Sequence, residues 1–407
     1  MLQEHDFSYQ NIALPYGLST GGDDRSHTAK KIFPDDLTGK SVLDIGAKYG
    51  YFCFEALKRG ATRVLGIDVD PTAIHKARLL ADCLGVEANF ELLDIETESI
   101  HETFDYVLCL NILHHLRNPL SALEKLTSMT RERLVLEVAA IGGHDRKKIG
   151  VSFAQQFLLN KAPLIFVSRS GSAGNKSFQK FFITSSAIEH LLKYHTNRFA
   201  RVDTVPSEHK NRYISIAHKR RIGKLVVIAG PTASGKSTLI KKLQRNEIPE
   251  IAHKVGIDDE AQWTVLAANA LTTFSEPFVK RAIFHYDFFR SYRRSAQVPQ
   301  RDEALDVLDA VEHVTFVTLW CPPEILQQRL QQAANTAKTK NGKSQDNKRY
   351  LMLATEYADS AKVRAHYQQW FAYTRTKPGE HLIVSLTDEV RCFPLEEWKD
   401  SISPFAS

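Results

Sequence analysis

The feature that most constrains the fold is a glycine-rich turn between an apolar run and a helical segment. Residues 225–229 have the pattern of a buried strand, and residues 237–243 have that of a helix. Between them, residues 230–238 read Gly-Pro-Thr-Ala-Ser-Gly-Lys-Ser-Thr and fit the template G-x-x-x-x-G-K-[ST] at every position. A strand, a tight loop and a helix in this order indicate an α/β domain with a parallel sheet.

This loop carries the chemistry of a phosphate site, which predicts ATP and Mg²⁺ as cofactors. Backbone N–H groups surround the phosphates, Lys236 reaches the β/γ oxygens, and the Ser237 hydroxyl binds the metal. The predicted ATP-binding residues are Gly230, Thr232, Ala233, Ser234, Gly235, Lys236, Ser237, Thr238 and Arg329. The predicted metal ligands are Ser237 and, directly or through water, Asp287.

The segment after the P-loop resembles small-molecule and nucleotide kinases. Residues 281–287 form a strand pattern that ends at Asp287, and Arg290 follows three positions later. Residues 321–330 resemble the kinase helix that carries a lid arginine, here Arg329. The resemblance implies phosphoryl transfer, with Lys236, Asp287 and Arg290 as catalytic residues and Asp287 as the base or the metal-positioning acid.

Other residues remain candidates for these roles. Residues 333–350 are polar and basic, which predicts a surface loop or a cationic lid over the phosphates. Arg293 and Arg294 are further candidates for phosphate contact. Asp258 and Asp259 are further candidates for the acid role. The loop also resembles that of the tRNA dimethylallyltransferases, but their Asp-Ser-x-Gln motif is absent from this sequence.

The N-terminal half contains a second strand–turn–helix unit. Residues 41–46 form an apolar strand ending in Asp-x-Gly, with Gly50 four positions after Gly46. Residues 63–68 form another strand, ending in Asp68. Such a glycine turn lets the backbone approach a charged cofactor, and the acid at the second strand end can accept both ribose hydroxyls.

Residues 42–52, 66–68 and 104–119 together resemble the class I S-adenosylmethionine-dependent methyltransferases, over about residues 36–140 with a looser similarity to 218. The resemblance implies that S-adenosylmethionine is bound by Asp44, Gly46, Ala47, Gly50, Asp68, Val69, Asp94, Ile95 and Asn111. Lys48 departs from the family, many of whose members have glycine there. A dehydrogenase is the alternative for an isolated glycine turn of this type.

Two further features concern the methyl acceptor. Residues 14–18 and 37–40 resemble the subgroup that includes the tRNA wobble-uridine carboxymethyltransferases, and some sugar methyltransferases also vary at Lys48. His114 and His115 are the catalytic candidates on this side, as bases for a hydroxyl acceptor or as positioning groups for a phosphate. Glu137 is interpreted as structural.

These patterns predict two α/β domains: a Rossmann-like methyltransferase sheet and a kinase-like parallel sheet of the P-loop type. We place the methyltransferase domain at residues 1–220, with an insertion at about 141–180, and the ATP-binding domain at 221–407. The polar basic stretch 219–224 is predicted to be the link, and each part is expected to fold by itself.

Composition adds few constraints. The formal net charge of +6 suits anionic substrates but does not require them. The five cysteines include no C-x-x-C pair, which argues against disulfides and zinc. There is no signal-peptide pattern and no apolar run long enough to span a membrane, so a cytoplasmic location is expected.

The sequence therefore predicts a bifunctional enzyme that methylates and phosphorylates a small-molecule or glycan acceptor, with a methyl phosphate as one product. The first alternative is an RNA-modifying methyltransferase with an accessory P-loop domain, so a nucleic-acid partner is possible but not favoured. The second is a methyltransferase whose P-loop domain only senses ATP. The sequence indicates neither the acceptor nor the oligomeric state.

Overall fold

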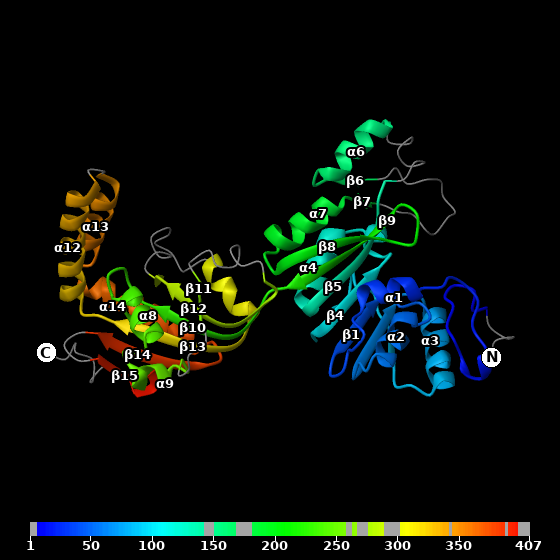
Figure 1. Ribbon diagram of the computed structural model, residues 1–407, viewed down its shortest axis with the longest axis horizontal. Helices are drawn as coiled ribbons and strands as arrows, with labels where there is room; N and C mark the ends of the chain where they lie inside the picture. The colour runs from blue at the N-terminus through cyan, green and yellow to red at the C-terminus, as the bar shows by residue number, and fades with distance from the viewer. Residues whose placement is uncertain are drawn as a thin grey trace. The chain divides into compact units, whose positions relative to one another are not determined.

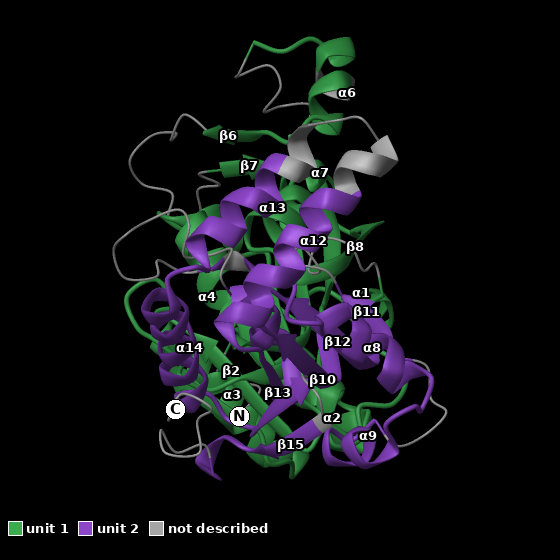
Figure 2. Cartoon of the chain, turned by 90° about the vertical axis from the view of Figure 1, so that its left-hand side faces the viewer, with its two compact units in different colours: residues 1–220, 275–277 green, residues 221–274, 278–407 purple. Residues whose placement is uncertain are grey.

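The chain forms two compact units, with the main division between Arg220 and Arg221 (Figure 2). The computed structural model describes residues 6–141, 150–167, 181–257, 263–266, 276–288, 302–341, 344–386 and 390–397. The five cysteines all lie in these ranges, and none of them forms a disulfide.

The first unit is built on a seven-stranded sheet with the order β3-β2-β1-β4-β5-β9-β8 (Figure 1). Its strands are β1 Ser41–Ile45, β2 Arg63–Asp68, β3 Asn89–Leu92, β4 Phe104–Leu110, β5 Thr130–Ala139, β8 Phe199–Pro206 and β9 Arg212–Lys219. β1 to β5 pair in parallel, whereas β9 is antiparallel to both β5 and β8. The strand order reverses between β1 and β4, and open α/β sheets bind their ligands at such a switch point.

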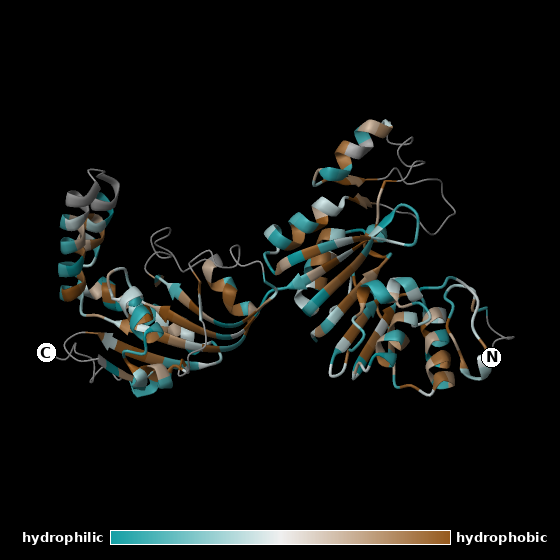
Figure 3. Ribbon diagram, viewed as in Figure 1, coloured by the Kyte–Doolittle hydropathy of each residue, from teal (hydrophilic) through white to brown (hydrophobic). Residues whose placement is uncertain are grey.

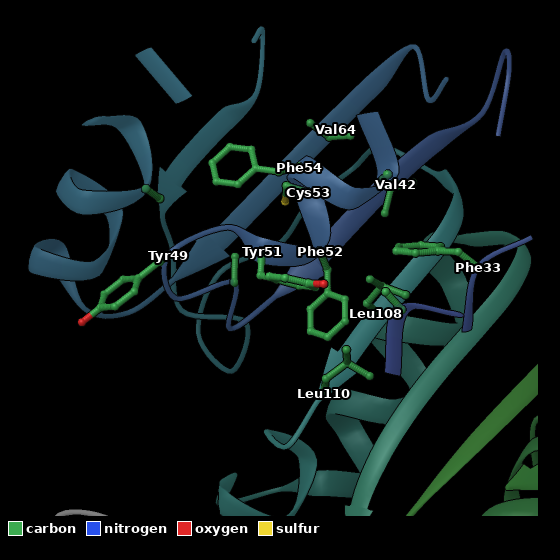
Figure 4. Packing of buried hydrophobic residues seen from close by; sticks show 14 of the residues in the cluster. Phe33, Val42, Tyr49, Tyr51, Phe52, Cys53, Phe54, Val64, Leu108 and Leu110 are labelled. Atoms are coloured by element: carbon green, nitrogen blue, oxygen red, sulfur yellow. The ribbon is translucent and has the colours of Figure 1, made fainter. Parts of the chain in front are cut away.

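Helices cover both faces of this sheet. They are α1 Ser26–Ile32, α2 Tyr51–Lys58, α3 Pro71–Leu84, α4 Pro119–Met129 and α7 Ser185–His190, with short turns η1 Pro15–Gly17, η2 Leu113–His115 and η3 Leu191–His195. Residues of α1, α2 and α3 share one core with the sheet, and residues of α4, α7 and η3 share the other. In the first core, the Phe52 side chain lies beside Leu108 and Leu110 of β4 (Figure 4).

The predicted insertion is described only in part. It contains α6 Phe153–Lys161 and β6 Ile165–Val167, which pairs antiparallel with β7 Phe181–Ile183. Residues 142–149 and 168–180 of the insertion lie outside the described ranges.

The second unit contains a six-stranded sheet with the order β11-β12-β10-β13-β14-β15. Its strands are β10 Arg221–Ala229, β11 Thr264–Leu266, β12 Phe278–Tyr286, β13 Val311–Trp320, β14 Glu380–Leu386 and β15 Val390–Pro394. All neighbouring strands pair in parallel except β14 and β15. β10 is central, because it pairs with β12 on one side and β13 on the other.

The helices of this unit are α8 Lys236–Gln244, α9 Pro249–Lys254, α12 Pro323–Asn341, α13 Ser344–Glu356 and α14 Ser360–Arg375, with short turns η4 Glu303–Ala310 and η5 Leu395–Glu397. α8 and α9 contribute to one core, and α12, α13 and α14 contribute to the core on the other face, around the buried Trp370. In both units the strands are mostly hydrophobic, and hydrophilic residues appear on the helices (Figure 3).

Two expectations about local structure are wrong. The described part of residues 333–350 belongs to α12 and α13 and not to a loop, because the alanine, lysine and arginine residues of this stretch are good helix formers. The stretch 219–224 is not a free link either. β9 ends at Lys219 and β10 begins at Arg221, and the buried Arg220 between them donates hydrogen bonds to Asn197 O and Oδ1 at 3.1 and 2.9 Å.

Candidate functional site

The turn after β1 reaches the segment after β4 at the switch point of the first sheet. Gly46 has a φ of 74°, and a Cβ there would lie 2.4 Å from Ile112 Cδ1. Gly50 has a φ of 87° and begins α2, and a Cβ there would lie 2.5 Å from the Phe90 ring. Only glycine suits both the backbone conformation and the close approach at these two positions, so the turn packs directly against Ile112 and Phe90.

Asp68, at the end of β2, is held by the same turn. Its Oδ2 accepts a hydrogen bond from Lys48 N and its Oδ1 accepts one from Asp70 N, both at 3.0 Å. Lys48 has a φ of 54°, in the left-handed region that favours glycine, and its Nζ pairs with Asp70 Oδ2 at 2.9 Å. The Asp68 carboxylate is therefore fixed in orientation at the sheet edge before any ligand binds.

Two buried oxygen atoms at this edge accept no hydrogen bond from any residue that the structure describes. They are Oδ2 of Asp44, whose residue is 2% exposed, and Oδ1 of Asn111, whose φ is 65°. Burial, and secondarily the charge of Asp68, raise the pKa of Asp44 to about 7, although Arg25 opposes the shift. Buried polar atoms are normally satisfied, so these oxygens suit a ligand that brings donors and positive charge.

The raised pKa of Asp44 predicts how stability depends on pH. Between about pH 4 and pH 7 the folded chain holds a proton on Asp44 that the unfolded chain releases, so rising pH lowers the free energy of unfolding. Without ligand, the free energy of unfolding of Asp44→Asn should fall less than that of the wild type between about pH 4 and pH 7. The difference should be up to about 4 kcal/mol, the value for a shift of about three pKa units. Urea unfolding at several pH values checks this, and an unchanged slope in the variant contradicts the assignment.

The other residues predicted to bind the methyl donor lie along the same edge. Val69 is 65% exposed directly after β2, and Ile95 is buried after β3. Asp94 is half-buried, and its Oδ1 accepts a hydrogen bond from Glu96 N at 2.8 Å. The structure thus places these side chains beyond β2 and β3, next to Asp68.

His114 and His115 differ in their suitability as a base. Their ring centroids lie 4.3 Å apart, but His114 is fully buried and neither of its ring nitrogens has a partner. Burial, followed by the charges of His115 and Arg212, lowers the pKa of His114 to about 3. Such an imidazole is a weak base, so the half-buried His115 is the better candidate of the two.

A polar cluster that no sequence motif predicts lies beside this edge. Arg25 Nη2 donates a hydrogen bond to Glu137 Oε2 at 3.0 Å, and Arg25 Nη1 contacts His209 Nε2. Ser207 Oγ donates to Glu137 Oε1. These residues are far apart in the sequence and belong to no motif, so only the interpretation of Glu137 as structural anticipated any part of it.

In the second unit, the predicted P-loop connects β10 to α8. Ala233 and Gly235 have φ values of 70° and 102°, and Gly235 begins α8. Lys236 Nζ donates hydrogen bonds to the carbonyls of Gly230 and Pro231, both at 2.7 Å. Burial lowers the pKa of Lys236 to about 8, although Asp287 opposes the shift. The ammonium group is thus enclosed by the loop itself.

Asp287 and Arg329 meet this loop from other elements. Asp287 Oδ2 accepts a hydrogen bond from the Thr232 hydroxyl and lies 3.8 Å from Lys236 Nζ. Arg329 Nη1, from α12, donates to the carbonyls of Ala233 and Ser234, both at 3.3 Å. Thus the structure gathers the predicted acid, the lysine and the arginine around one loop.

The remaining predictions for this loop differ in outcome. Ser234 Oγ is buried without a partner, and Ser237 and Thr238 are exposed on the first turn of α8. Arg290, Arg293, Arg294, Asp258 and Asp259 lie outside the described residues.

Within the described residues, no three His, Cys, Asp or Glu side chains are grouped as metal ligands. No helix among them has the length and apolar character to cross a bilayer.

Comparison with known proteins shows a family match within the first unit. A family described as "Methyltransferase domain" matches residues 36–162. The chain is 32% identical over 117 residues to the tRNA U34 carboxymethyltransferase of Idiomarina loihiensis, covering 27% of this chain and 36% of that protein. It is 31% identical over 154 residues to the ribosomal protein L11 methyltransferase of Edwardsiella ictaluri, covering 37% of this chain and 51% of that protein. The chain therefore spans about a third to a half of these curated relatives.

Solved structures are similar to somewhat less than half of the chain. An S-adenosylmethionine-dependent methyltransferase from Aquifex aeolicus has a TM-score of 0.32 and 20% identity, over 48% of this chain and 89% of that chain. The magnesium protoporphyrin IX methyltransferase of Synechocystis, solved with bound S-adenosylmethionine, has a TM-score of 0.32 and 19% identity, over 45% of this chain and 71% of that chain. The family match lies within the first unit, which is therefore similar to methyltransferase domains over residues 36–162.

Proposed function

We propose that the first unit binds S-adenosylmethionine at the switch point and transfers its methyl group to an acceptor. The observation that carries this proposal is the convergence of the Gly46 turn, the oriented Asp68 carboxylate and two unpartnered buried oxygens at one sheet edge. A sulfonium cofactor with an ammonium group supplies the positive charge and donors that these oxygens lack.

Each residue has a distinct role in this proposal. Asp68 accepts hydrogen bonds from the ribose hydroxyls, and Asp44 and Asn111 accept them from the amino group. Val69, Asp94 and Ile95 surround the adenine. When bound, S-adenosylmethionine supplies an electrophilic methyl group. For a hydroxyl acceptor, His115 takes the proton, whereas an acceptor that is already anionic needs no base.

Asp68→Ala tests the assignment of the donor site. Removing a charge-assisted contact should weaken S-adenosylmethionine binding by at least about 1.5 kcal/mol, or roughly tenfold in Kd. Calorimetry on the full chain measures this, and ATP binding should be unchanged. Asp82→Ala, on the exposed face of α3, is the matched control because it removes the same charge without a predicted contact. Equal affinities in the two variants contradict the site.

For the second unit we propose ATP binding and phosphoryl transfer to a hydroxyl. The arrangement of Lys236, Asp287 and Thr232 around the loop supports this. On binding, Lys236 moves its hydrogen bonds from the loop carbonyls to phosphate oxygens, and Ser237 contributes to a Mg²⁺ site. The acceptor oxygen forms the new bond to phosphorus, the bond to the leaving ADP breaks, and Asp287 takes the hydroxyl proton.

For the whole chain, we favour two transfers to one small-molecule or glycan acceptor, because tethering raises the effective concentration of a shared intermediate. The names of the sequence relatives support an RNA alternative, in which the acceptor is a tRNA nucleoside. In the third possibility, the second unit binds ATP without turnover. Tight RNA binding that weakens steeply with salt favours the RNA alternative, and nucleotide binding without turnover on any acceptor tested favours the third.

A further inference from the structure

A group of basic side chains lies at the carboxyl end of β5 and the beginning of β9, outside the residues that the motifs predict. Arg25 precedes α1, His209 lies between β8 and β9, and Arg212 is the first residue of β9. We call Arg25, His209 and Arg212 the edge cluster. The Glu137 carboxylate, which Arg25 and Ser207 contact, is fully buried beneath it.

The register of the sheet brings these residues to one face. Arg212 pairs with Ala139, and Ile214 pairs with Glu137. Because alternate residues of a strand share a face, Arg212 lies on the same face as Glu137. Arg25 reaches this face from the N-terminal side, where its guanidinium lies 5.5 Å from the Phe52 ring. Arg25, Glu137 and Arg212 therefore meet at one edge of one face.

This edge adjoins the proposed donor site. Asn111 N donates a hydrogen bond to Glu137 O at 2.9 Å, so the turn after β4 and the end of β5 are in direct contact. Arg25 also acts electrostatically on Asp44. The edge cluster thus adjoins the turn that carries Asn111 of the proposed donor site.

The charges of the edge cluster are not balanced. The Glu137 carboxylate forms an ion pair with Arg25 and so neutralises its charge. The Arg212 guanidinium, in contrast, forms no hydrogen bond or ion pair with any described residue. Burial and then Arg25 lower the pKa of His209, Glu137 and Asp23 oppose this, and Arg212 lowers it further. Arg212 also lowers the pKa of His114, after burial and His115.

We propose that the edge cluster is a subsite for an oxyanion, a phosphate or carboxylate group carried by the methyl acceptor, with Arg212 as its main ligand. A guanidinium presents a planar set of N–H donors that match the oxygens of such groups. Arg25 is held in place by Glu137, and His209 by Arg25, so the subsite is oriented before the anion binds. The inference rests on the proposed methyl transfer for the identity of the ligand, and it narrows the acceptor to an anionic molecule.

The test is a titration of the full chain with inorganic phosphate, and separately with acetate, at constant ionic strength. NMR of the histidine rings reports on His209, whose signal is identified with His209→Gln. Because the P-loop can also bind phosphate, this local signal is the readout. Anion binding should shift the His209 signal and raise its pKa, since a nearby negative charge favours the imidazolium.

Arg212→Gln should raise the apparent Kd for phosphate at His209 about tenfold, as expected for loss of a charge-assisted contact. Arg212→Lys, which keeps the charge, should raise it less. Arg201→Gln is the matched control, because Arg201 is exposed on β8 and pairs with Asp203. A His209 signal that responds to neither anion, or equal affinity in wild type and Arg212→Gln, overturns the subsite.

The same samples separate this inference from the proposed function. If calorimetry shows S-adenosylmethionine binding while His209 ignores both anions, only the subsite is wrong. If the anions bind at His209 while S-adenosylmethionine does not bind at all, the proposed methyl transfer is wrong and the edge cluster remains an anion site of another kind.

Discussion

Asp287→Asn should abolish phosphoryl transfer and leave ATP binding nearly intact, whereas Lys236→Ala should impair both. Asp287 lies 3.8 Å from Lys236 Nζ and accepts a hydrogen bond from Thr232, so an amide keeps the shape of this contact but cannot take a proton. Loss of a general base typically costs about 100- to 10,000-fold in rate. Lys236 donates two hydrogen bonds within the loop, and its removal takes away the γ-phosphate contact.

Nucleotide affinity and turnover measured for both variants, once an acceptor is found, distinguish the two failures. Lys241→Ala, on the last turn of α8, is a control that removes a lysine away from the loop. Turnover above about a tenth of the wild-type value in Asp287→Asn contradicts its role as base. Asp258 and Asp259 then become the next residues to substitute.

Separate fragments should show where the second unit begins. We expect residues 1–220 and 221–407 each to fold and bind their own cofactor, and a fragment starting at residue 224 to be much less stable. The shorter fragment loses Ile222, which is fully buried and pairs with Val279 and Val311 on the two neighbouring strands. Truncating a buried isoleucine costs about 2–5 kcal/mol, a large part of the roughly 5–15 kcal/mol that stabilises a domain.

Urea unfolding of the two C-terminal fragments measures this difference. In the longer fragment, Ile222→Ala should reproduce most of the loss, and Ile222→Val should cost only about 0.5–1.5 kcal/mol. Equal stability of the fragments starting at 221 and 224 would mean that the first three residues of β10, 221–223, contribute nothing to the core. Failure of the fragment 1–220 to fold would contradict the independence of the first unit.

The sequence by itself determined the parts of this protein that depend on local order along the chain. Alternating strand and helix patterns predict both parallel sheets, and the turns that include Gly46 and Gly235 predict where the backbone approaches a ligand. These predictions depend on backbone conformation and on neighbours within a few residues, which a motif contains. The polar and basic composition of residues 333–350 predicts a loop, but the helical propensity of the alanine and lysine residues favours the helices α12 and α13.

Only the tertiary structure decided which distant residues share a site and in which protonation state. The register of β5 and β9 places Arg212 on the face of Glu137, and the chain before α1 brings Arg25 to both. Neighbouring histidines look equivalent in the sequence, yet His114 is fully buried and its pKa falls to about 3. Burial and charge at a site are summed over all elements packed around it, so no local pattern in the chain contains them.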